Sequence, residues 1–117
     1  WQIMINGDTY KPIVAETAAK SAAKVYNRIM VTHLLMDNTK DNRVAGAVGF
    51  NVRTGDFYVF RSKAVIVAAG GASHIFKPRS VGEGMGRTWY APWSSGSAYA
   101  LPIQVGAKMT QMENRIV

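Results

Sequence analysis

The chain of 117 residues contains no cysteine, so it supplies no disulfide, no thiolate nucleophile and no cysteine ligand for zinc or an iron–sulfur cluster. It also lacks an uninterrupted apolar run of the roughly 18 residues that indicate a membrane-spanning helix. Its first residues do not show the basic and then apolar pattern of a secretion signal. We therefore predict a cytoplasmic protein without a membrane span.

Histidine and acidic residues are scarce. His33 and His74 are isolated in the sequence, so they predict no metal site. The 14 Lys and Arg against 7 Asp and Glu give a net charge of +7, which is compatible with a basic nucleic-acid-binding module that uses Lys77, Arg79 and Arg87. The basic residues are scattered, however, without an arginine-rich helix or an aromatic RNA-binding signature. We predict no nucleic-acid partner; a pocket for a phosphate or sulfate group, or a solvated face, also explains the charge.

The two ends indicate an incomplete domain. The chain opens at Trp1 without an initiator methionine and stops at Val117, just after a polar segment. An apolar content of 48% is enough for a modest core. We expect residues 1–117 to be one internal segment of a longer domain.

The first half of the sequence predicts a helix followed by an antiparallel meander. The expected elements are a short strand over residues 1–5, a turn at 6–8, a helix from Pro12 to about Tyr26, and strands over 28–36, 44–52 and 57–61. Pro12 suits a first helical turn, and the apolar face that follows predicts a helix packed against other elements. Glu16 and Lys20 are spaced for an ion pair on that helix.

Residues 63–71, Lys-Ala-Val-Ile-Val-Ala-Ala-Gly-Gly, predict one strand buried on both faces. Val65, Ile66 and Val67 are β-branched and suit a packed sheet. Gly70 and Gly71 permit positive φ and a close approach to the main chain. Two interpretations stay open from this stretch alone: a core strand that ends in a tight turn, or the edge of a ligand site.

A long loop then leads to a second helix. Gly82, Gly84 and Gly86 could together cradle an anion, although they follow a loop and are no dinucleotide fingerprint. Residues 94–97, Ser-Ser-Gly-Ser, offer N-caps for a helix over 98–106, and such a helix start suits an anion or a pyrophosphate. Pro102 inside that helix predicts a bend or a later start.

Two of these stretches resemble the fumarate reductase and succinate dehydrogenase flavoprotein superfamily. Residues 65–71 resemble its second flavin-binding signature, hydrophobic residues followed by Ala-Thr-Gly-Gly, and residues 95–113 resemble its Gly-Asp-Gly helix and the next strand. Ala69 stands where Thr is usual and Ser97 where Asp is usual. Main-chain contacts with the flavin are therefore the expected ones.

Within that superfamily the chain is similar to the alpha subunits of dissimilatory adenylylsulfate reductases, over residues 28–36, 43–55 and 77–97, and most specifically over 87–96. The resemblance covers essentially the whole chain. It implies an α/β fold, a piece of a Rossmann-like FAD-binding domain with a helix, a β-meander, a buried strand ending in Gly-Gly, a long loop and a helix. It also implies an FAD enzyme that reduces adenylylsulfate to AMP and sulfite, or the reverse in sulfur oxidisers. In that family a flavin N5–sulfite adduct forms, and an iron–sulfur beta subunit with two four-iron clusters delivers the electrons.

The resemblance also implies roles for individual residues. Val31 would contact the adenine through its main chain, and Trp89 would line the substrate pocket with Arg87 beside it. The residues expected to border FAD are Ala69, Gly70, Gly71, Ser95, Gly96 and Ser97. No catalytic residue is assigned, because the family's first Gly-x-Gly-x-x-Gly motif is expected before Trp1 and its main substrate arginine and histidine beyond Val117.

Two alternatives stay open beside this interpretation. A fumarate or succinate enzyme should keep Asp at the position of Ser97 and lack the tryptophan-rich loop. A basic nucleic-acid-binding module is the alternative from another class. The isolated segment is expected neither to hold FAD nor to fold stably.

Overall fold

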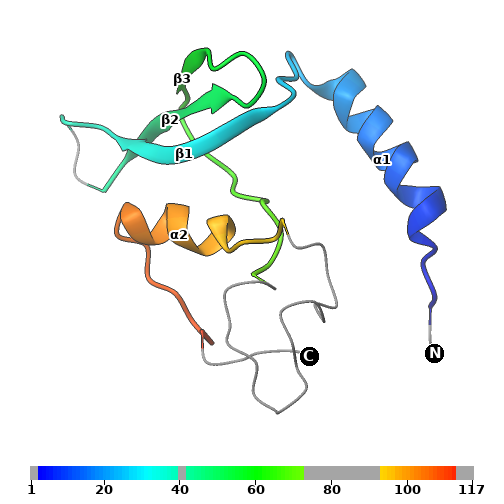
Figure 1. The fold of residues 1–117 in the computed structure, drawn as a ribbon. Coiled ribbons are helices and arrows are strands. Elements are labelled where there is room, and N and C mark those ends of the chain that lie inside the picture. Colours follow the sequence, from blue (N-terminus) through cyan, green and yellow to red (C-terminus); the bar gives the residue numbers. More distant parts are fainter. Residues whose placement is uncertain (1–2, 40–41, 73–92, 113–117) are drawn as a thin grey trace, which may run out of the picture.

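The computed structural model describes residues 3–39, 42–72 and 93–112 (Figure 1). The elements follow the order α1 (Gly7–Ser21), β1 (Ile29–Met36), β2 (Val44–Asn51), β3 (Phe57–Arg61) and α2 (Ser97–Gln104). Figure 1 shows α2 beside β1 and α1 standing apart from the sheet. Among the described residues, no helix is long and apolar enough to cross a membrane.

Helix α1 begins earlier in the chain than the sequence predicted. The turn expected at residues 6–8 is wrong, because Gly7 already lies in the helix and Asn6 precedes it as the N-cap residue. The Asn6 carbonyl accepts a hydrogen bond from the Tyr10 amide at 3.2 Å, which starts the helix ahead of the proline. Pro12 therefore lies inside the helix rather than in its first turn. Residues 3–5 form no strand, which also corrects the first expected element.

The predicted packing role of α1 is wrong for the described structure. None of its residues is buried, and Ile13 remains 59% exposed. The expected ion pair does form, with Lys20 Nζ 2.7 Å from Glu16 Oε1. Because α1 contacts no other helix or strand in the described part of the chain, its apolar face has nothing there to pack against.

The antiparallel meander is confirmed, in the strand order β1-β2-β3. At the central strand, Gly49 of β2 lies between Val31 of β1 and Tyr58 of β3. A Cβ on Gly49 would come within 2.3 Å of the Met30 carbonyl oxygen, so only glycine fits at this close approach. The pairing with β1 shifts register just after Val31, as in a β-bulge.

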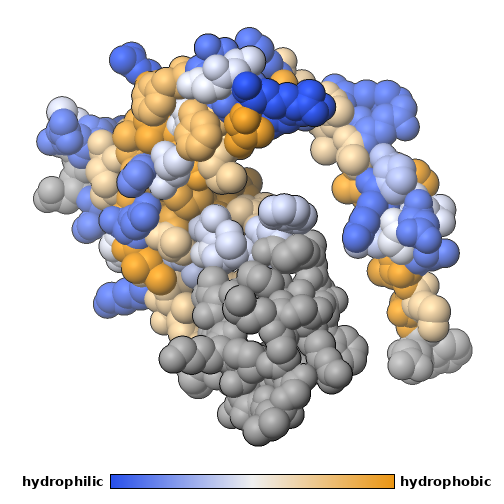
Figure 2. All heavy atoms as spheres, viewed as in Figure 1, coloured by the Kyte–Doolittle hydropathy of each residue, from blue (hydrophilic) through white to orange (hydrophobic). Residues whose placement is uncertain are grey.

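The core of the described structure is small. Its buried apolar residues are Ala47, Ala72 and Leu101. Tyr58 and Phe60 lie two residues apart on β3, and the Tyr26 ring meets the Phe60 ring edge-on at 5.1 Å between centroids. Figure 2 shows the hydrophobic residues gathered over the sheet, with hydrophilic residues around them. These aromatic contacts, rather than a deep core, cover part of the sheet.

The buried strand expected at residues 63–71 is not present. The backbone there is irregular, and Ile66 is 92% exposed. A strand forms only where a neighbouring strand can share its backbone hydrogen bonds. The described residues offer this segment only an isolated antiparallel bridge at its end, between Ala72 and Ser95. The local pattern of the sequence was β-like, but no partner strand is supplied in the described part of the chain.

Helix α2 confirms the predicted second helix, and it begins at Ser97 rather than later. Gly96 is its N-cap residue, and no side chain caps the helix, so the expected serine cap is wrong. Pro102 lies inside the helix, and Leu101 beside it is buried on the helix that contacts β1. The helix ends at Gln104 rather than at the predicted Gly106, and Gly106, at φ 84°, lies just beyond its end.

Candidate functional site

The structure brings the Gly-Gly segment against the start of α2. The Gly96 amide donates a hydrogen bond to the Gly71 carbonyl at 3.3 Å. Next to it, Ala72 and Ser95 form the isolated antiparallel bridge, with Ala72 buried. Two stretches that are far apart in the sequence, and that were both expected to border a flavin, therefore meet at one place.

Glycine is required at two positions of this junction. Gly70 has φ 79° and Gly96 has φ 88°, both in the left-handed region that side chains disfavour. A Cβ on Gly70 would contact the Ser94 hydroxyl oxygen at 3.4 Å. Gly71 differs from these two, because its φ is ordinary and no described atom lies within 4 Å of the Cβ it lacks. Among the described residues, nothing covers the main chain of Gly71 on that side.

The start of α2 carries the partial positive charge of the helix dipole, and no described side chain compensates it. The Gly96 carbonyl accepts hydrogen bonds from the amides of Tyr99 at 2.9 Å and Ala100 at 3.0 Å. The amides of Ser97 and Ala98 come before these and have no partner within the helix. No side chain caps this end, and no acidic residue lies in the first turn. Free amides together with the helix dipole favour a negatively charged group here.

The predicted site residues have different outcomes. Six of them, Ala69, Gly70, Gly71, Ser95, Gly96 and Ser97, lie in the two segments that meet. Val31 lies on β1 opposite Gly49, half-buried, on the strand that α2 contacts. Arg87 and Trp89 lie outside the described residues, so their roles stay predictions. The same is true of His74, Lys77, Arg79, Gly82, Gly84 and Gly86.

Ser94 is a residue that reasoning from the sequence missed as a neighbour of the Gly-Gly segment. Its hydroxyl lies against the open side of Gly70. The small residues of both segments indicated that each could approach another backbone closely. That Ser94 meets Gly70 depends on the path of the chain between the two segments. His33 is exposed on β1 opposite Val48, and the described residues hold no group of three metal-ligating side chains.

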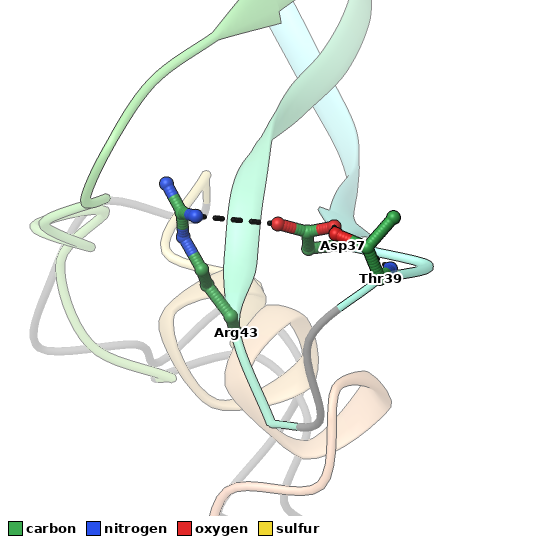
Figure 3. Close-up of polar contacts among 3 residues, drawn as sticks. All are labelled: Asp37, Thr39 and Arg43. Atoms are coloured by element: carbon green, nitrogen blue, oxygen red, sulfur yellow. Dashed lines mark hydrogen bonds and ion pairs between the residues drawn. The ribbon is translucent and has the colours of Figure 1, made fainter.

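A separate polar cluster closes the β1–β2 hairpin (Figure 3). The Thr39 hydroxyl donates to Asp37 at 2.7 Å, the Thr39 amide donates to the same oxygen at 2.9 Å, and Arg43 lies 3.3 Å from the other carboxylate oxygen. The Thr39 hydroxyl and amide, and then Arg43, lower the pKa of Asp37. These contacts stabilise the turn, and they lie at the hairpin rather than at the glycine junction.

Comparison with known families agrees with the cofactor expected at that junction. The family described as "FAD binding domain" matches residues 2–116. The chain belongs to this family. The chain is also similar to the alpha subunit of the adenylylsulfate reductase of Megalodesulfovibrio gigas, at 55% identity over 120 residues, covering 100% of the chain and 18% of that protein. A more distant relative belongs to the fumarate reductase (CoM/CoB) of Methanothermobacter marburgensis, at 28% identity over 84% of the chain and 16% of that protein.

Two solved structures are similar to this chain. One is adenosine-5-phosphosulfate reductase in complex with sulfite as a covalent adduct, at 52% identity and a TM-score of 0.77. The other is adenylylsulfate reductase from Archaeoglobus fulgidus, at 53% identity and a TM-score of 0.77. Both matches cover 92% of the chain and 17% of the solved protein. The chain is thus an α/β piece of an FAD-binding fold, and it spans less than a fifth of the length of the proteins it matches.

Proposed function

We propose that the chain is part of an FAD-dependent adenylylsulfate reductase, which converts adenylylsulfate to AMP and sulfite. The observation that carries the proposal is the 55% identity to an adenylylsulfate reductase over all of the chain. In this reaction the bond between the sulfate sulfur and the bridging phosphate oxygen breaks, AMP leaves with that oxygen, and the sulfur accepts two electrons. In sulfur oxidisers the same reaction would run in reverse.

The glycine junction fits FAD. No described atom covers the main chain of Gly71 on the side of its missing Cβ, and the amides of Ser97 and Ala98 offer donors at the positive end of α2. We infer that these groups hold a negatively charged part of FAD, while Gly70 lets the backbone turn beside it. Bound FAD would supply the electron exchange with sulfur. The roles of Val31 at the adenine and of Trp89 and Arg87 at the substrate are part of the proposal.

The electrons would come from a second subunit. Both named relatives are themselves single subunits of larger enzymes. We propose that the partner is an iron–sulfur beta subunit, as the similarity to the alpha subunit of an adenylylsulfate reductase implies. The cytoplasmic location that the sequence predicts stays a prediction.

The test is the visible spectrum of the complete parent protein, purified with its partner subunit, before and after adding sulfite. We expect flavin absorbance that decreases when sulfite is added. A flavin spectrum that does not respond to sulfite would contradict the reductase assignment, and the absence of flavin would contradict the cofactor site as well.

A fumarate reductase is the second candidate, and the 28% identity to one of the subunits of such an enzyme is the observation that favours it. Ser97 argues against it, because that superfamily usually has Asp at this position. Turnover assays of the complete protein with adenylylsulfate and with fumarate separate the two. Turnover of fumarate alone would replace the first proposal by the second.

A further inference from the structure

We draw no further inference here: the strongest candidate, the open hollow bordered by the ends of β1 and β3 and the start of β2, carries none, because the chain spans less than a fifth of the length of the proteins it matches and nothing in the structure shows what covers this surface.

Discussion

Substituting Gly71 by alanine separates a cofactor contact from a folding requirement. Gly71 has an ordinary φ, and no described atom lies within 4 Å of the position that the new Cβ would take. The change should therefore leave the stability of the apo protein within about 0.5 kcal/mol of the original. If FAD lies against this part of the main chain, the added methyl group instead meets the cofactor.

The expected loss of affinity follows from the overlap. Forcing one extra carbon into a packed contact costs about 1–3 kcal/mol, which corresponds to a Kd for FAD that rises roughly 5- to 150-fold. The assay is a fluorescence titration of the complete apo protein with FAD, together with thermal unfolding of the apo protein. Both measurements are made on the same variant, so affinity and stability are compared directly.

The matched control is Gly55→Ala in the β2–β3 turn. Gly55 has φ 78° and likewise no described atom within 4 Å of its missing Cβ. Alanine there should cost about 1 kcal/mol of stability through backbone strain, without changing the affinity for FAD. The reasoning would be refuted if Gly71→Ala left FAD binding unchanged, or if it lowered the stability of the apo protein as Gly55→Ala does.

Three further predictions concern the scaffold. Gly49→Ala should destabilise the complete protein by about 2 kcal/mol or more in chemical denaturation, since its Cβ would come within 2.3 Å of the Met30 carbonyl oxygen; an unchanged midpoint would contradict this close approach. Thr39→Val removes the hydroxyl that donates to Asp37, so the pKa of Asp37 should rise in a carboxyl NMR titration. A carboxyl whose pKa is lowered in the folded state stabilises that state above the unfolded-state pKa, and this stabilisation is lost as the pH falls through the folded-state pKa. Thr39→Val should therefore lower the free energy of unfolding at neutral pH and leave it unchanged in acid. The isolated 117-residue chain should show no sharp two-state melt by circular dichroism, because its described core is small; a cooperative transition would contradict this.

The meander could be predicted because local contacts specify it. Asn51 accepts hydrogen bonds from the amides of Arg53 at 2.9 Å and Thr54 at 3.3 Å, so the β2–β3 turn is held by a residue adjacent to it in the sequence. Asp37 and Thr39 do the same for the β1–β2 turn. Turn residues and alternating apolar residues were therefore sufficient to place all three strands.

The predictions were wrong where the structure of a segment depends on contacts with a distant part of the chain. The expected strand over residues 63–71 has the right composition, but a buried parallel strand forms only beside other strands, and the described residues place none there. The packing of α1 failed for the same reason, since its apolar face meets no other element in the described part of the chain. The start of α1 failed locally, because Asn6, Gly7 and Asp8 suit a turn and a helix start equally well.

The sequence by itself determined the three strands of the meander, the second helix and the family, because turn residues, apolar periodicity and the glycine-rich signatures are all readable within short windows. The tertiary structure decided that Gly71 and Gly96 meet through a hydrogen bond, and that Ser94 lies against Gly70. It also decided that Arg61 and Lys63 border one hollow with Ser62. These contacts join residues on different elements, so they depend on the path of the chain in space, which no short window of sequence contains.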